Sequence, residues 1–141
     1  MRTIHSIASI PFALLAVFGV FACASVASAA ELRVRCEQRL PAARSRVSVD
    51  ARSLPQLNAM YSARVLSGTA QATHVPLTAV GDAVEFDFDS DPADIAAGAQ
   101  SIASNFIVGG TVQAAVFDAN GVMVAGPTAA ACRLRVPIRA R

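Results

Sequence analysis

The sequence predicts an all-β fold, specifically an immunoglobulin-like β-sandwich of seven to eight short strands. Two observations lead to this prediction. Apolar and polar residues alternate in several short runs that are rich in valine, and residues typical of turns lie between these runs. Alternation with a period of two places every second side chain on one face of a strand, so each run has one apolar and one solvated face.

The clearest strand covers residues 84–89, where Val84, Phe86 and Phe88 alternate with acidic residues. The apolar runs 112–117 and 122–125 are separated by Asp118-Ala119-Asn120-Gly121, and an Asn-Gly pair in this position predicts a tight hairpin because both residues tolerate positive φ. The same alternation predicts four further strands, at residues 32–36, 46–52, 61–65 and 132–136.

One segment has the pattern of a short helix. Asp91 is a typical N-cap, Pro92 suits the first helical position, Asp94 lies in the first turn and Gly98 ends the segment. Residues 91–98 allow two turns at most, so we expect a short crossover helix between two strands.

The first thirty residues have the pattern of a secretory signal peptide. Arg2 is followed by 28 residues without a charge, and small residues at Ala27 to Ala30 fit the cleavage site of a signal peptidase. A retained membrane anchor is the main alternative, because this stretch is long enough to span a bilayer. Cys23 would be the modified residue of a lipoprotein, but Phe21 fits that motif poorly. The sequence thus predicts a signal peptide at 1–30 and a single domain at 31–141.

Two cysteines, Cys36 and Cys132, remain after this cleavage. Exported proteins fold in an oxidising environment, so we expect these two to form a disulfide. The bridge would close a 96-residue loop, which corresponds to about 4–5 kcal/mol in the chain-entropy model. A zinc site is excluded because His74 is the only histidine outside the signal peptide, and four ligands are needed. Both cysteines lie on the predicted apolar faces of their strands.

The composition argues against catalysis. All 12 basic residues are arginine, so lysine chemistry is absent, and no nucleophile motif accompanies His74. Glu85, Asp87 and Asp89 have a carboxylate spacing within the range of glycosidases, but no aromatic platform for a sugar accompanies them. We therefore expect a protein that is not an enzyme.

Charge is segregated along the chain. Arginine is confined, outside the signal peptide, to residues 31–64 and 132–141, whereas all charged residues of 65–131 are acidic. The simpler interpretation is that basic strands pair with acidic strands across the sheet. The alternative is contact with an anionic membrane surface or polysaccharide through Arg133, Arg135, Arg139 and Arg141. Nucleic acid is excluded, because the arginine-rich strands carry no stacking aromatic residues.

An acidic run is the other candidate site. Carboxylates at Asp87, Asp89, Asp91 and Asp94, with Asp82 nearby, suit calcium, which prefers oxygen ligands. An EF-hand is excluded because Pro92 and Gly98 stand where its loop needs glycine and glutamate. The alternative is structural: Asp87 and Asp89 face water, Asp91 caps the helix, and Asp94 favours the positive helix N-terminus.

Residues 102–110 contain three consecutive bulky apolar residues, Phe106 to Val108. We expect the beginning of a strand buried on both sides, with an exposed binding loop as the alternative.

Taken together, these features predict an exported, non-catalytic interaction or structural module of the bacterial envelope or exterior, located in the periplasm or secreted. Its partner would be an envelope or extracellular protein, with no cofactor and with no membrane span after cleavage. The alternative is a periplasmic protein that binds a small ligand or calcium through residues 82–94.

Overall fold

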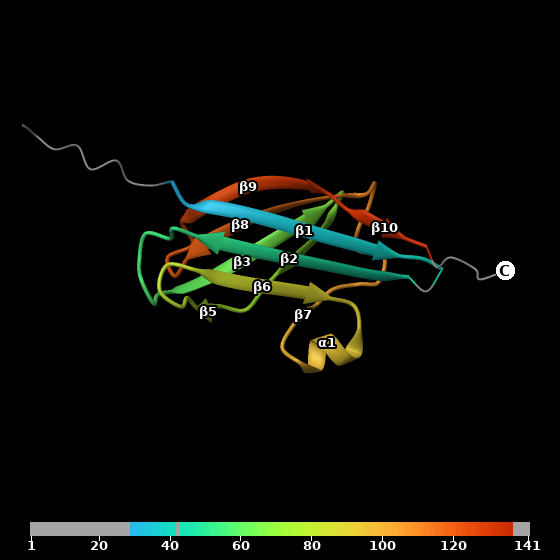
Figure 1. Cartoon of the computed structure of the whole chain (residues 1–141), viewed down its shortest axis with the longest axis horizontal. Helices are drawn as coiled ribbons and strands as arrows, with labels where there is room; N and C mark the ends of the chain where they lie inside the picture. The colour runs from blue at the N-terminus through green and yellow to red at the C-terminus, as the bar shows by residue number, and fades with distance from the viewer. Residues whose placement is uncertain (1–28, 42, 137–141) are drawn as a thin grey trace, which may run out of the picture.

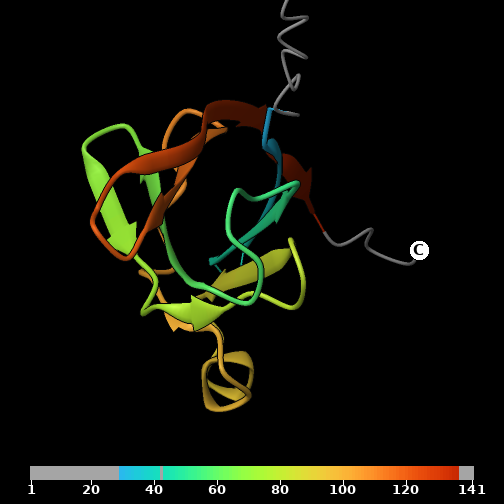
Figure 2. The same cartoon turned by 90° about the vertical axis from the view of Figure 1, so that its left-hand side faces the viewer.

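The computed structural model describes residues 29–41 and 43–136. The predicted signal peptide lies outside the described residues, except for Ala29 and Ala30, and so do Arg139 and Arg141. The described residues form ten strands and one short helix, arranged as two sheets (Figure 1). The all-β prediction is therefore confirmed, and an end-on view shows the strands of both sheets surrounding a common interior (Figure 2).

Sheet A contains the basic strands and the most acidic strand next to each other. Its pairing is antiparallel in the centre and parallel at both edges. In spatial order its strands are β10 (Arg133–Arg135), β1 (Glu31–Arg39), β2 (Arg44–Arg52), β6 (Val84–Asp89) and β7 (Gln100–Ser101).

Sheet B faces sheet A and is antiparallel throughout. Strand β5 pairs with the beginning of β3, beside β4. The strands of sheet B are β4 (Ala70–Thr73), β3 (Met60–Ser67), β8 (Thr111–Asp118), β9 (Met123–Ala131) and β5 (Leu77–Thr78).

The core lies between the sheets and follows the alternation seen in the sequence. Val47 and Val49 of β2, and Phe86 and Phe88 of β6, are fully buried, while the residues between them are at least partly exposed. The expectation that Asp89 faces water was wrong, because this residue is buried at the end of β6. Sheet B contributes the inward side chains of β3 and β8, including Val65. A period of two therefore identified the inner face of these strands correctly.

The predicted helix and hairpin are both present. Helix α1 (Pro92–Ala96) begins after Asp91, whose carboxylate accepts a hydrogen bond from the backbone N–H of Ala93 at 2.9 Å. The β8–β9 turn is closed by the Asp118 carboxylate, which accepts hydrogen bonds from two backbone N–H groups, and Gly121 adopts a φ of 77°. The helix cap at Asp91 and the turn at Asn120-Gly121 were therefore predicted correctly from the local sequence.

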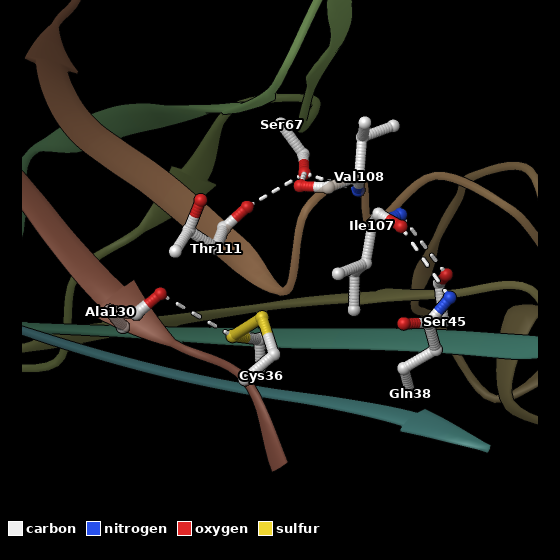
Figure 3. Close-up of a disulfide and its surroundings, with 9 residues drawn as sticks. Cys36, Gln38, Ser45, Ser67, Ile107, Val108, Thr111 and Ala130 are labelled. Atoms are coloured by element: carbon white, nitrogen blue, oxygen red, sulfur yellow. Dashed lines mark hydrogen bonds between the residues drawn. A yellow bond between two sulfur atoms is a disulfide. The ribbon is translucent and has the colours of Figure 1, made fainter. Parts of the chain in front are cut away.

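The two sheets are joined at one edge by a chain crossing and a disulfide. After β9 the chain passes directly from sheet B to sheet A, and Cys132 lies at this crossing. It forms the expected disulfide with Cys36 of β1, with Cα atoms 4.6 Å apart (Figure 3). The bridge therefore ties the last crossing of the described chain to its first strand.

The last predicted strand is only partly as expected. Its three residues in β10 pair in parallel with β1, but Leu134 and Val136 do not face the core: their exposed fractions are 59% and 61%. The prediction of an apolar inner face here was wrong. Strand β10 extends the edge of sheet A next to β1 alone, so its side chains are not covered by sheet B.

Residues 102–110 form a connection rather than the beginning of a strand. Phe106 and Ile107 are buried as expected, whereas Val108 is exposed. The Ser45 hydroxyl of sheet A accepts a hydrogen bond from the N–H of Ile107, and the Ser67 hydroxyl of sheet B accepts one from the N–H of Val108 at 2.7 Å (Figure 3). The segment is thus a connection that is hydrogen-bonded to both sheets and buries the side chains of Ile102, Phe106 and Ile107.

Candidate functional site

The acidic run is organised around the guanidinium group of Arg44. The Nε and Nη2 atoms of Arg44 donate to the two carboxylate oxygens of Asp89 at 3.0 and 2.7 Å. Arg44 also forms ion pairs with Asp91, at 3.2 Å, and with Asp94. The three carboxylates that looked like cation ligands therefore converge on an arginine of the neighbouring strand.

Asp89 is the centre of this cluster because its side chain is only 1% exposed. Burial by itself would raise the pKa of Asp89, but the hydrogen bonds from Arg44 and from the backbone N–H of Asp91 outweigh it, so the pKa is lowered. The same contacts raise the pKa of Arg44. Both groups are therefore charged at neutral pH, and Arg44 compensates a carboxylate that water does not reach.

Asp87 and Asp82 lie outside this cluster. Asp87 accepts a hydrogen bond from the Ser48 hydroxyl and lies 4.0 Å from Arg46, while Asp82 is exposed in the turn before β6. Within residues 29–41 and 43–136, no group of three acidic, histidine or cysteine side chains could hold a metal ion. A calcium ion at the acidic run would have to displace the Arg44 guanidinium.

The outer face of sheet A is a ladder of opposite charges. Arg35 of β1 lies 2.8 Å from Asp50 of β2 and 3.5 Å from Glu85 of β6. Arg46 of β2 lies 3.8 Å from Asp89 of β6. The expectation that basic strands pair with the acidic strand is confirmed, and most of the charge segregation in the sequence is explained by contacts inside the protein.

Burial raises the pKa of Glu85 on this face, and the nearby carboxylates Asp50 and Asp87 add to the shift. Three acidic groups are therefore crowded at the β2–β6 side, whereas arginines gather at the β10–β1 side. The ladder is thus unevenly charged across the width of the sheet.

Arginines exceed acidic residues at the β10–β1 edge. Arg33 and Arg133 make no ion pair within the described part of the chain. Arg39 and Arg135 share one carboxylate, Glu37, each at 2.7 Å. Hydrogen bonding to Arg39 lowers the pKa of Glu37, and Arg135 lowers it further against the opposing effect of burial. One carboxylate thus serves two guanidinium groups, and this edge is left with a positive excess.

A shallow groove of about 800 Å³ crosses this arginine-rich side. Its lining includes Arg33, Arg35, Arg46, Arg133, Glu37 and Glu85. Of the four arginines predicted to contact an anionic surface, Arg133 lies in this groove and Arg135 lies beside it on β10. We define β1, β10 and this groove as the arginine face.

His74 packs against the hydrophobic core. Its ring is buried and lies edge-on to Phe86 and Phe88, with centroids 5.3 and 5.4 Å away, and its Nδ1 atom is 2.8 Å from the carbonyl oxygen of Val75. The sequence predicted a loop histidine, and His74 does lie in the connection between β4 and β5, where its ring is buried against two aromatic rings.

The roles of Arg44, Ser45 and Ser67 could not be predicted from the sequence. The role of Arg44 was missed because it depends on the register that places β2 beside β6. The hydrogen bonds of the Ser45 and Ser67 hydroxyl groups could not be predicted, because the sequence does not show which backbone groups a buried serine will meet. The alternation could have predicted that Ser45 is buried, because Ser45 lies on the same face of the strand as Val47 and Val49.

Comparisons with protein-family models, with curated proteins and with solved structures find no match to this chain. The described residues contain no helix that is both long and apolar enough to cross a membrane.

Proposed function

We propose that this protein is an exported, non-catalytic interaction module of the bacterial envelope or exterior, and that its docking surface is the arginine face. The observation that carries this proposal is the positive excess at β1 and β10, where Arg33 and Arg133 have no ion pair among the described residues. On the neighbouring strand β2, Arg44 and Arg46 are matched by carboxylates, and Arg52 at the end of that strand makes no ion pair among the described residues. An anionic group on a partner would supply the missing counter-charge, and guanidinium groups suit carboxylate and phosphate geometry.

The use of the titratable side chains supports a binding role over a catalytic one. Asp89, Asp91 and Asp94 hold Arg44, and His74 packs against two phenylalanine rings. A general acid or base must be within reach of a substrate, whereas these groups stabilise the fold.

Export is proposed from the signal-like residues 1–30, and the disulfide supports it. Cys36 and Cys132 are paired, and such bonds persist in oxidising compartments such as the periplasm or the exterior. The partner would then be an envelope or extracellular component.

The sandwich is further proposed to be immunoglobulin-like. The hydroxyl of Tyr61, at the start of β3, donates to the carbonyl oxygen of Gln56 at 2.9 Å and accepts from the N–H of the same residue at 3.0 Å. A tyrosine that bonds to the backbone a few residues upstream is typical of the corners of such sandwiches.

The test is site-specific photo-crosslinking in the native host. A photoreactive residue replaces Arg33 on the arginine face, and a matched probe replaces Gln71, which is exposed on β4 of the opposite sheet. We expect a discrete adduct from position 33 only. No adduct from position 33, or the same adduct from both positions, would contradict a docking surface on sheet A. The N-terminal residue of the recovered protein, read by mass spectrometry, tests export separately, and an uncleaved N-terminus would contradict it.

A further inference from the structure

Large apolar side chains are exposed beside the arginine excess, at the end of sheet A where β1 finishes. Leu40, Leu134 and Val136 have exposed fractions of 40%, 59% and 61%. They are neighbours in space, because the backbone N–H of Leu40 donates to the carbonyl oxygen of Arg135 at 3.0 Å and Leu134 pairs with Gln38 of β1. The three side chains therefore form one apolar group at one end of the molecule.

Arginines lie on the other face of the same edge. Arg133 and Arg135 alternate with Leu134 on β10, and Arg39 precedes Leu40, so these arginines project from the face opposite to the apolar side chains. Their only carboxylate partner within the described residues is Glu37, which Arg39 and Arg135 share. We define the basic–apolar tip as Arg39, Leu40, Arg133, Leu134, Arg135 and Val136.

The tip combines exposed apolar side chains with an excess of arginine. All three residues of β10 are exposed, including Leu134, and Val136 directly after the strand is exposed as well. An exposed apolar group on a soluble surface marks a contact site when it is contiguous and rimmed by polar groups. Here cationic side chains project from the other face of the same edge strand, so a partner that contacts the whole edge must be both anionic and able to accept apolar side chains.

We propose that the basic–apolar tip binds the surface of an anionic lipid bilayer. The edge formed by β10 and the end of β1 would lie in the boundary between headgroups and acyl chains, with Leu40, Leu134 and Val136 on its apolar face and the three arginines of its other face in contact with lipid phosphates. A soluble polyanion would satisfy the arginines but leave the apolar side chains in water, so the composition of the tip favours a bilayer. This inference rests on the proposed function and names the partner of the arginine face.

The sequence that follows the described residues has the same character. Residues 137–141 read Pro-Ile-Arg-Ala-Arg, which adds one bulky apolar side chain and two arginines. These residues would strengthen the attraction to an anionic surface, and the proposal does not depend on their position.

The experiment is co-sedimentation of the purified protein, as recovered from cells, with lipid vesicles. Phosphatidylcholine vesicles with about 30 mol% phosphatidylglycerol are compared with pure phosphatidylcholine vesicles, at about 50 and about 300 mM NaCl. We expect binding to the anionic vesicles alone, and a lower bound fraction at the higher salt. Equal binding to both kinds of vesicle, or binding to neither, would overturn the proposal.

Variants then separate the two components of the tip. Arg133→Gln should weaken binding about fivefold, because one charge near an anionic surface is lost. The double variant Leu134→Ser/Val136→Ser should weaken it about tenfold or more, because two buried contacts are lost. Leu57→Ser is the matched control: Leu57 is 69% exposed, but it lies in the β2–β3 connection at the opposite end of the sandwich, and binding should be unchanged.

A soluble polyanion distinguishes failure of this inference from failure of the proposed function. If the protein binds dextran sulfate through Arg33 and Arg133 but binds no vesicle, the bilayer is the wrong partner and the arginine face stands. If the Leu134→Ser/Val136→Ser variant binds vesicles as well as the original protein does, the apolar side chains do not enter the bilayer and the proposal is wrong. Unfolding midpoints of all variants should match the original protein, since the altered side chains are exposed.

Discussion

Arg44, the first residue of β2, and Asp89, the last residue of β6, form an ion pair with two hydrogen bonds at the point where α1 follows. The Asp89 side chain has almost no contact with water, yet its pKa is lowered. Both Asp89 and Arg44 are therefore charged in the ion pair. The same guanidinium reaches Asp91, which caps α1, and Asp94 in its first turn. One arginine thus joins the sheet to the short helix beside it (Figure 1).

Replacement of Arg44 should destabilise the protein strongly. Arg44→Gln would leave the buried Asp89 carboxylate without its counter-charge, and loss of one partner of a buried pair costs about 3 kcal/mol or more. The free energy of unfolding from urea titration measures this effect. Arg35→Gln is the matched control: Arg35 also pairs with two carboxylates but is half exposed, so its loss should cost less than about 1 kcal/mol. Equal losses in the two variants would contradict the structural role of Arg44.

The same pair predicts a loss of stability in acid. The pKa of Asp89 is lower in the folded protein than in the unfolded chain, so its contribution is fully present above the unfolded value of about 4 and is lost as the pH falls through the folded pKa. Urea titrations from pH 6 downward to about pH 2 should show this decline. Glu37 contributes in the same direction, because its pKa is also lowered. In Arg44→Gln the decline should be smaller, and an unchanged decline would mean that other carboxylates cause it.

The titration of Glu85 should affect the free energy of unfolding in the opposite direction. Because burial and neighbouring carboxylates raise its pKa in the folded protein, its protonation favours folding as the pH falls through that raised value. Glu85→Gln should therefore stabilise the protein at neutral pH, and the gain should disappear in acid. A loss of stability at neutral pH would instead mean that the contact of Glu85 with Arg35 outweighs the crowding.

The central strands of this fold could be predicted from sequence because burial on one face imposes a period of two. Residues 84–89 show this most clearly, since Phe86 and Phe88 are buried and Glu85 is exposed. The helix was predictable for a local reason, the side chain of Asp91. In contrast, the partner of the acidic run could not be predicted, because Arg44 is 45 residues from Asp89 and meets it only through the register of β2 with β6.

Strand β10 shows the limit of the same pattern. Arg133, Leu134 and Arg135 alternate as a half-buried strand would, yet all three are exposed. Alternation reports that a strand has two chemically different faces, but not whether another sheet covers the apolar one. Whether it is covered depends on where the strand is added to the sheet, and here the strand is added outside β1.

Calcium should not stabilise the protein. The Arg44 guanidinium already neutralises the carboxylates of Asp89, Asp91 and Asp94, so a cation would have to compete with it. The thermal midpoint in millimolar calcium should equal that in chelator. A midpoint that rises with calcium concentration, as expected for a ligand that binds only the folded state, would instead support the calcium-binding alternative for residues 82–94.

Gly126 should be intolerant of any side chain. It has a φ of 90°, and a Cβ atom there would lie 2.7 Å from the carbonyl oxygen of Ala114 and 2.9 Å from Cδ2 of Leu32. Gly126→Ala would therefore add a clash to the backbone strain, with a combined cost of about 3 kcal/mol. Gly98→Ala is the control, because Gly98 also has a positive φ but open space around it, so only the strain of about 1 kcal/mol remains. Similar unfolding free energies for the two variants would mean that β1 and β9 can move apart at Gly126.

Loss of the disulfide should destabilise the protein, because the unfolded chain then lacks a cross-link that limits its conformational freedom. The double variant Cys36→Ser/Cys132→Ser removes a cross-link between residues 96 apart, and the chain-entropy model gives a loss of about 4–5 kcal/mol. The bond itself is checked by intact mass, which should rise by two hydrogens on reduction. If the native mass does not change on reduction, the cysteines are not paired in the isolated protein. Because Cys132 lies where the chain leaves sheet B for β10, reduction should also loosen the basic–apolar tip, and vesicle binding by the reduced protein should fall more than binding of dextran sulfate, which needs only the charges.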